Sequence, residues 1–244
     1  MQTIILGDGH LGWAIAAAAG ERGERTPVLG RPAGSRHDPT AFLGADLVVD
    51  ATTAAAVLPN VSAALEAGVR RFVIATTGWG SDREAVERAL AEAGAAAVVS
   101  ANFSLGMALF GRLVETAAEL FGAVPSFDPF LVEWHRRTKA DRPSGTALEL
   151  ARRMTARHAG LATTDDLEVV SILAGASPGM HLVGFDAVGE TIELRLTARD
   201  RSAYASGVLA AADWLGRATR APGIHPFDPV VDELLARPVD AAAA

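Results

Sequence analysis

The sequence predicts an α/β protein, with an N-terminal Rossmann-like, doubly wound parallel sheet and a second α+β domain built on a mixed or antiparallel sheet. Through residue 100, short apolar strands alternate with helices, which is typical of a parallel sheet covered on both faces. Beyond residue 160, three strands follow one another without an intervening helix. That pattern indicates a mixed or antiparallel sheet and therefore a second domain.

The composition excludes several classes of function. Of the 244 residues, 50% are hydrophobic and 21% are charged, which is typical of a globular protein. The net charge of -7 argues against a general nucleic-acid-binding protein, because neutralising phosphates requires a basic surface. The chain has no run of about 18 or more uncharged apolar residues, so we predict no membrane span.

Cysteine and histidine bear on the kind of site. The chain has no cysteine, which excludes disulfides, thiolate catalysis and cysteine-ligated zinc and suits a cytoplasmic protein. The six histidines are scattered, and none stands at metal-ligand spacing from another. We therefore predict a cytoplasmic protein without a metal site.

The first element is a strand at residues 3–6, followed by a glycine-rich loop and an alanine-rich helix to about residue 23. In a strand, G-x-G-x-x-G and helix sequence, the glycines let the backbone approach a pyrophosphate and the helix N-terminus offers free N–H groups. We expect a dinucleotide here, although an ordinary strand-to-helix turn is the alternative. The loop consists of Gly7, Asp8, Gly9, His10, Leu11 and Gly12.

The second strand, at residues 26–29, bears on the choice of cofactor. Enzymes that prefer NAD place an acid near the end of this strand, on the ribose 2′-hydroxyl. Residues 26–37 contain no Asp or Glu but do contain Arg31 and Arg36. Because a cation suits a 2′-phosphate, we predict a preference for NADPH over NADH, with Arg31 as the contact. The alternative is that both arginines are solvated loop residues.

Three further strands, at residues 45–50, 71–75 and 96–100, alternate with helices at residues 57–67 and 82–93. Ligands of such sheets bind beyond the carboxyl ends of the strands, and these three ends carry small or polar residues. Each alone is compatible with an ordinary loop, but together with the glycine loop they favour a cofactor cleft. The expected contacts are Thr52, Ala75, Thr76, Thr77, Ser100, Ala101, Asn102 and Phe103.

The pattern changes beyond residue 106. We predict helices at residues 107–121, 146–158 and 202–219, and strands at residues 130–134, 167–173, 180–187 and 190–197. The tail holds Pro222, Pro226 and Pro229, then a short helix and a frayed end of four alanines.

Residues 133–147, EWHRRTKADRPSGTA, concentrate cations in an acidic chain. The Pro-Ser-Gly-Thr turn precedes a helix, whose N–H groups and positive dipole suit a carboxylate or phosphate, and Ser144 and Thr146 add hydroxyl donors. His135 exchanges a proton near neutral pH, and Lys139 supplies charge or a proton. The stretch therefore indicates a pocket for a small anion, and the alternative is a solvated basic loop whose serine only caps a helix.

These segments resemble the dihydrodipicolinate reductases, also called 4-hydroxy-tetrahydrodipicolinate reductases. That family carries E-x-H-H-x-x-K-x-D-A-P-S-G-T-A, which matches residues 133–147. Its T-T-G and N-F-S-x-G segments match residues 76–78 and 102–106, and its G-x-x-x-G-x-H matches Gly175, Gly179 and His181. The matches lie in order over nearly the whole chain.

The resemblance implies an NAD(P)H-dependent reduction of a cyclic unsaturated imine dicarboxylate in lysine and diaminopimelate biosynthesis. It implies that His135 is the acid/base residue, that Lys139 donates a proton and that Gly145 and Thr146 bind a substrate carboxylate. It also implies a homotetramer assembled through the second sheet. The domains would be residues 1–106 for the dinucleotide, with residues 202–244 returning to it, and residues 107–201 for substrate binding and oligomerisation.

Three departures from the family pattern concern the substrate. The second histidine of the motif is Arg136 here, which can still bind a carboxylate bidentately. The arginine before the later glycine segment is Leu173, and an H-[RK]-A segment is replaced at residues 196–198 by Leu-Thr-Ala. Two alternatives therefore stay open: an oxidoreductase of this fold that acts on a different imine or keto acid, and a non-enzymatic dinucleotide sensor.

Overall fold

The structure is a computed structural model that describes residues 1–32 and 36–236. It divides into two compact units, one holding Met1–Leu105 and the segment from Arg201 onward, and the other holding Gly106–Asp200. The frayed end predicted for the four terminal alanines lies outside the described residues. Among the described residues, no helix is both long and apolar enough to cross a membrane.

The first unit is built on a six-stranded, entirely parallel sheet in the order β10-β5-β4-β3-β1-β2. The Rossmann-like parallel sheet predicted from the alternation of strands and helices is therefore confirmed. The edge strand β10, in the proline-rich tail, was not predicted. The strands are β1 Thr3–Leu6, β2 Val28–Leu29, β3 Leu47–Asp50, β4 Arg71–Ile74, β5 Ala96–Val99 and β10 Gly223–His225.

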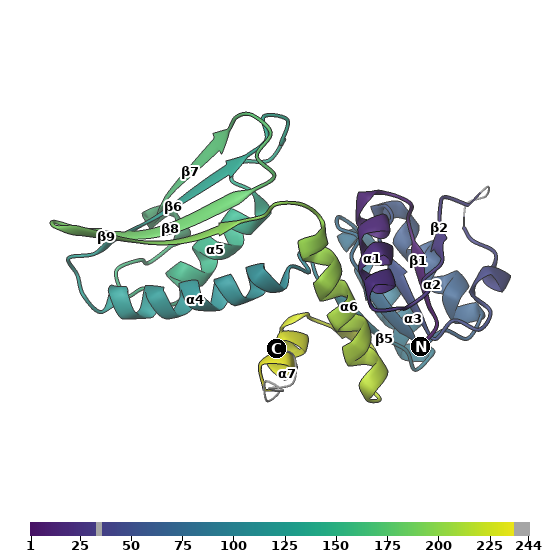
Figure 1. The fold of residues 1–244 in the computed structure, drawn as a ribbon. Helices are drawn as coiled ribbons and strands as arrows, with labels where there is room; N and C mark the ends of the chain where they lie inside the picture. Colours follow the sequence, from purple (N-terminus) through teal and green to yellow (C-terminus); the bar gives the residue numbers. More distant parts are fainter. Residues whose placement is uncertain (33–35, 237–244) are drawn as a thin grey trace. The chain divides into compact units, whose positions relative to one another are not determined.

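Helices cover both faces of this sheet, because alternate residues of its central strands point to opposite sides. Ile4, Leu6, Val48, Phe72 and Ile74 form one buried core with side chains of α2 and α3. Helices α1 and α6 pack against each other on the opposite face, and α7 packs on α6 (Figure 1). These helices are α1 His10–Glu21, α2 Val57–Glu66, α3 Arg83–Glu92, α6 Ser202–Arg217 and α7 Asp228–Leu235.

The second unit holds a four-stranded mixed sheet in the order β7-β6-β8-β9. Strand β6 pairs parallel with β7 and antiparallel with β8, which pairs antiparallel with β9. Helices α4 and α5 cover one face (Figure 1), so the predicted α+β arrangement on a mixed sheet is confirmed. The elements are α4 Leu105–Gly122, β6 Asp128–His135, α5 Gly145–Thr155, β7 Glu168–Leu173, β8 Met180–Ala187 and β9 Glu190–Thr197.

Short 3₁₀ turns lie in the loops between the main helices and strands. They lie at Pro39–Phe42, Ala54–Ala56, Gly80–Asp82 and Thr164–Asp166.

Candidate active site

The loop between β1 and α1 requires glycine at two positions. Gly7 has φ +103°, and a Cβ there would lie 2.3 Å from the carbonyl oxygen of Ala51. A Cβ on Gly12 would lie 1.9 Å from the carbonyl oxygen of Gly7. Gly9 is the N-cap of α1, and residues 8–10 are exposed. The loop therefore folds tightly and presents the N-terminus of α1 to a ligand.

The ends of β3 and β4 are joined by a buried carboxylate. Asp50 is 1% exposed, and its Oδ1 accepts hydrogen bonds from the hydroxyls of Thr52 at 2.7 Å and Thr76 at 2.6 Å. Its Oδ2 accepts from the Asn60 amide at 2.8 Å. Two of the three threonines predicted as contacts, Thr52 and Thr76, therefore have their hydroxyls committed to Asp50. Their backbone N–H groups also donate within the protein, that of Thr52 to Asp50 Oδ1 and to the Thr76 hydroxyl, and that of Thr76 to the Asp50 carbonyl.

The segment after β5 forms a turn that is held by its own side chains. The Ser100 hydroxyl donates to the carbonyl of Asn102 at 2.8 Å, and Asn102 Oδ1 accepts from the Ser104 N–H at 2.9 Å. The ring of Phe103 is 2% exposed and packs edge-to-face on Phe227, with centroids 5.0 Å apart. Ala101 is exposed. This end of the sheet offers a ligand backbone groups and small side chains, while the Phe103 ring belongs to the core.

Charged groups of both signs stand at the end of β2. Arg36 forms a bidentate ion pair with Glu66, with N–O distances of 2.7 and 3.1 Å, whereas Arg31 is exposed and has no ion pair among the described residues. A Cβ on Gly30 would lie 2.8 Å from a carboxylate oxygen of Asp8. An acid therefore does reach the end of β2, although it comes from the glycine loop.

The first unit fits a dinucleotide. The close approach at Gly7 and Gly12 gives a loop that no larger residue could form, at the start of a helix whose N–H groups are available for a pyrophosphate. Exposed Thr77 and half-buried Leu11 and Ala75 lie at the same carboxyl edge of the sheet. The residues predicted to contact the cofactor are thus gathered at the edge where such sheets bind nucleotides.

In the second unit, the strand register gathers four polar side chains on one face. Glu133 of β6 stands opposite Ser171 of β7 and His181 of β8, and residues directly opposite share a face. His135 lies two positions beyond Glu133 and so points the same way. Leu131, two positions before Glu133, belongs to the core under α4 and α5. The polar cluster therefore continues the helix-covered face of the sheet.

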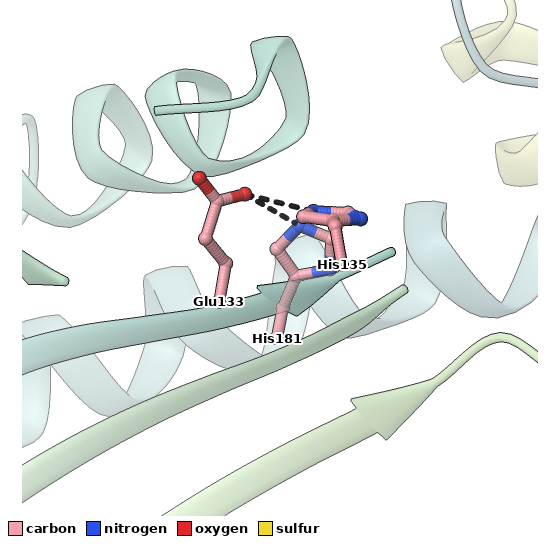
Figure 2. Close-up of side chains that lie close together, drawn as sticks. All are labelled: Glu133, His135 and His181. Atoms are coloured by element: carbon pink, nitrogen blue, oxygen red, sulfur yellow. Dashed lines mark hydrogen bonds and ion pairs between the residues drawn. The ribbon is translucent and has the colours of Figure 1, made fainter. Parts of the chain in front are cut away.

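Glu133 is 0% exposed and hydrogen-bonded through both oxygens. Oε1 accepts from the Ser144 N–H at 2.8 Å and the Ser171 hydroxyl at 2.6 Å. Oε2 lies 2.8 Å from Nε2 of His135 and 3.7 Å from Nε2 of His181 (Figure 2). Burial acts to raise the pKa of Glu133, but the hydrogen bonds from Ser144, Ser171 and His135 outweigh it and lower that pKa. The side chain is therefore a buried carboxylate.

The two imidazoles of the cluster differ in their surroundings. Burial lowers the pKa of His181 to about 4, His135 and Lys139 add to the shift and Glu133 opposes it. His181 is therefore neutral at pH 7. His135 has its Nδ1 edge next to Gly179, where a Cβ would lie 3.3 Å from Nδ1. A side chain at residue 179 would therefore crowd that edge of His135, and glycine avoids this.

The loop between β6 and α5 carries the remaining predicted residues. Ser144 is the N-cap of α5, and its hydroxyl accepts from the Ala147 N–H at 3.1 Å. Gly145 is exposed and Thr146 is half-buried in the first turn. Lys139 Nζ lies 2.6 Å from Asp141 Oδ1, a hydrogen bond that lowers the pKa of Asp141. Arg136 is exposed. The loop thus places a helix N-terminus and a lysine beside the histidine cluster.

Two of the departures from the family pattern fall inside this cluster. Leu173 stands opposite His135, and Leu196 stands opposite His181. Leu196 also packs on the apolar core beneath α4 and α5. Apolar side chains therefore flank both imidazoles, and the sheet offers fewer polar groups there than the family pattern implies.

Glu133, His135 and His181 also form a set of donors with the composition of a metal site. One carboxylate oxygen and two ring nitrogens lie within 4.8 Å of one another. The spacing of the histidines did not predict this set, because residues 135 and 181 are far apart along the chain. The carboxylate is already saturated by donors from the protein itself, so the geometry is that of a complete hydrogen-bond network.

Sequence reasoning missed Asp50, Asn60 and Ser171, and it assigned no role to Glu133 or His181. A signal was present for Glu133. In FLVEWH, the two-residue alternation that buries Leu131 also buries Glu133 and His135. Ser171 and His181 depend on pairing between strands distant in sequence, and nothing local indicated it.

Comparison with known proteins agrees with this arrangement. The family profile described as dihydrodipicolinate reductase, N-terminus, matches residues 6–103, and that of the C-terminus matches residues 106–230. A 4-hydroxy-tetrahydrodipicolinate reductase of Archaeoglobus fulgidus is 35% identical over 79% of this chain and 78% of its own. The enzyme of the same name from Methanopyrus kandleri is 37% identical over 77% of this chain and 71% of its own.

Among solved structures, a dipicolinate-bound dihydrodipicolinate reductase from Paenisporosarcina sp. TG-14 has the same fold. Its TM-score is 0.72 at 19% identity, and the match covers 93% of this chain and 97% of that one. The matching profiles together span most of the sequence, and both relatives exceed 30% identity over more than two thirds of it. The chain therefore belongs to the dihydrodipicolinate reductase family, whose members are NAD(P)H-dependent oxidoreductases.

Proposed function

We propose that this protein reduces 4-hydroxy-tetrahydrodipicolinate to tetrahydrodipicolinate, a step of lysine and diaminopimelate biosynthesis, with NADPH preferred and NADH accepted. The observation that carries the proposal is the joining of His135 to the N-terminus of α5 through the buried Glu133. An acid/base group and an anion site are thereby fixed beside each other on one unit. A reduction of an anionic imine needs both.

The residues of the second unit divide the work. The N–H groups of Gly145 and Thr146 at the start of α5, with the Thr146 and Ser144 hydroxyls, receive a substrate carboxylate. Arg136, which precedes this turn in the same loop, is exposed and can bind the other carboxylate in a bidentate manner. His135 and Lys139 exchange the proton that must accompany a hydride. Reaching tetrahydrodipicolinate also releases the 4-hydroxyl as water.

The first unit holds the cofactor, which supplies the hydride when bound. The glycine loop receives the pyrophosphate, and the backbone of residues 75–77 and 100–103 lines the rest of the nucleotide site. Arg31 supports the preference for NADPH, since Arg36 is already paired with Glu66. Asp8, against Gly30, offers an acceptor to a ribose hydroxyl. That acceptor supports the use of NADH as well.

A coupled assay tests the proposal. A synthase makes the cyclic substrate from pyruvate and aspartate semialdehyde, and absorbance follows the oxidation of NADPH, and separately of NADH, by the purified protein. We expect turnover well above background with both cofactors and a higher kcat/KM with NADPH. Absence of turnover, together with retained NADPH binding, would refute the substrate while leaving the family and cofactor in place.

A second substrate is favoured by one observation. Leu173 and Leu196 flank the two imidazoles, where the family pattern has polar residues, so a different imine or keto acid is the alternative. A panel of cyclic imines and 2-keto acids in the same assay distinguishes the two. The non-enzymatic sensor has no comparable support, because His135 and Lys139 are both present.

We also propose that the protein is a cytoplasmic homotetramer. It assembles through the face of the second sheet that α4 and α5 do not cover. Trp134, Val170 and Ile172 are 38%, 42% and 43% exposed, and they alternate with Glu133, His135 and Ser171 along their strands, so they point away from α4 and α5. Apolar side chains gathered on one face are typical of an interface. Sedimentation velocity checks the assembly, with a monomer as the contrary result.

A further inference from the structure

Glu133 serves a different part of the candidate site with each of its two oxygens. Oε1 holds the Ser144 N–H, which begins α5, and Oε2 holds Nε2 of His135. The strand places the side chain with no exposed surface, so it has little freedom to move. One rigid group therefore sets both the anion-binding turn and the acid/base histidine.

The hydrogen bonds also decide which nitrogen of His135 carries a proton. Glu133 is ionised, because its hydrogen bonds lower its pKa despite burial, and a carboxylate can only accept. At a separation of 2.8 Å, Nε2 of His135 must be the donor. Nδ1 is then the nitrogen that exchanges a proton, and it lies on the edge of His135 next to Gly179.

The second imidazole does not compete for this role. His181 faces the same Oε2 at 3.7 Å and the Ser144 hydroxyl at 3.4 Å. It stays neutral at pH 7, because burial, with smaller contributions from His135 and Lys139, lowers its pKa to about 4 against the opposing effect of Glu133. The cluster thus contains two histidines that differ in their contact with the carboxylate, and only His135 is held at full hydrogen-bond distance (Figure 2).

We propose that Glu133 is the positioning residue of this reductase: it fixes His135 with Nε2 protonated and Nδ1 exposed to substrate, in register with the carboxylate-binding start of α5. This inference rests on the acid/base role proposed above for His135. It extends that role, because it assigns the reacting nitrogen and the group that selects it.

The substitution Glu133→Gln separates the two functions of the side chain. The Ser144 backbone N–H is an obligate donor, so the Gln carbonyl must take the place of Oε1, and the amide NH₂ then faces His135. Nε2 becomes an acceptor, and the proton moves to Nδ1. We expect kcat to fall about 100-fold, as when a catalytic histidine is held in the wrong tautomer or loses its orienting partner. The KM for the dicarboxylate should change less than about threefold, since the turn keeps its bond.

NMR, a comparison variant and NADPH binding together test the positioning role of Glu133. NMR of the His135 ring nitrogens should show a protonated Nε2 in the wild type and a protonated Nδ1 in the variant. Ser171→Ala is the comparison variant, because it removes a bond to Oε1 only, and its spectrum should keep Nε2 of His135 protonated, as in the wild type. NADPH binding, measured by fluorescence, should be unchanged in both variants.

A double-mutant cycle distinguishes failure of this inference from failure of the proposed function. If Glu133 acts through His135, adding Glu133→Gln to His135→Gln should cause no further loss of kcat. An inactive His135→Gln with a fully active Glu133→Gln, or independent losses in the double variant, would overturn the role of Glu133 alone. A fully active His135→Gln would overturn the proposed acid/base role as well. A wild-type spectrum with Nε2 unprotonated would refute the inference whether or not the variants fold.

Discussion

The two units differ in what they leave facing a ligand. In the first unit, the polar side chains at the strand ends bond to one another: Asp50 holds Thr52, Thr76 and Asn60. The glycine loop and the N-terminus of α1 are left for the proposed nucleotide. In the second unit, the buried carboxylate of Glu133 instead bonds to His135, the proposed acid/base residue. A buried acid near a strand end thus has a different effect in each unit. Asp50 holds the conformation of the strand ends, whereas Glu133 is proposed to determine which nitrogen of His135 carries a proton.

This difference predicts how each unit should fail. Substitutions in the first unit should act through shape and weaken nucleotide binding. Substitutions of His135 or Glu133 in the second unit should act through proton transfer and leave nucleotide binding intact.

The largest effect is expected for His135→Gln. General acid–base catalysis contributes about 10²–10⁴-fold, so kcat in the coupled assay should fall at least about 100-fold with the dissociation constant of NADPH unchanged. His158→Gln is the control. His158 is a buried histidine of the same unit that stacks on Phe185, outside the cluster, and its loss should reduce stability without changing kcat per folded molecule. Equal kcat values for both variants would contradict the proposed acid/base role of His135.

The next effect concerns shape in the first unit. A Cβ at Gly12 would lie 1.9 Å from the Gly7 carbonyl oxygen, so Gly12→Ala must move the loop. We expect it to cost roughly 1–3 kcal/mol of stability and to weaken NADPH binding at least tenfold, roughly 1.4 kcal/mol.

Gly20→Ala is the matched control for Gly12→Ala in the same helix. Nothing lies within 4 Å of a Cβ at Gly20, and replacing a helical glycine with alanine should stabilise by about 0.5–1 kcal/mol. Urea unfolding and fluorescence titration measure both variants. Wild-type nucleotide affinity in Gly12→Ala would show that the loop's shape does not govern binding.

The parts predictable from sequence follow the same division. The parallel sheet was predictable because local alternation specifies it, and residues 180–187 and 190–197 were predicted with the boundaries that β8 and β9 have. Strand β10 was missed. Its three residues sit in a proline-rich tail, and only pairing with β5 makes them a strand.

The candidate residues were predictable where chemistry is local to one motif, as for His135, Lys139 and Ser144. What could not be predicted is which side chains contact one another. Glu133 meets His181 and Ser171 through the register of three strands, and Asp8 reaches Gly30 across two strand ends. Such contacts depend on the fold as a whole and leave no periodic signal in the sequence.

The buried His181 predicts a pH dependence of stability. Its pKa is about 4 in the folded protein against an ordinary 6.5, so the unfolded chain binds the extra proton between these values. Stability is therefore retained above about pH 6.5 and lost as pH falls toward 4. Between pH 7 and pH 5 this group alone should cost roughly 2 kcal/mol. Urea unfolding of the wild type and His181→Gln at both pH values measures it, and an equal loss in both proteins would contradict the assignment.

The smallest effect concerns the cofactor's 2′-phosphate, and it tests whether the first unit relies on shape alone. Arg31→Ala should raise the KM for NADPH about tenfold, worth roughly 1.4 kcal/mol, and change the KM for NADH about twofold or less. Arg36→Ala is the control, because its partner is Glu66 and exposed pairs contribute about 0–1 kcal/mol. Asp8→Asn should act in the opposite direction, weakening NADH more than NADPH. If neither Arg31 nor Asp8 alters the ratio of the two KM values, the glycine loop and backbone carry recognition by themselves. The first unit would then recognise the nucleotide through its backbone conformation alone, whereas the second unit is proposed to act through the side chains of His135 and Glu133.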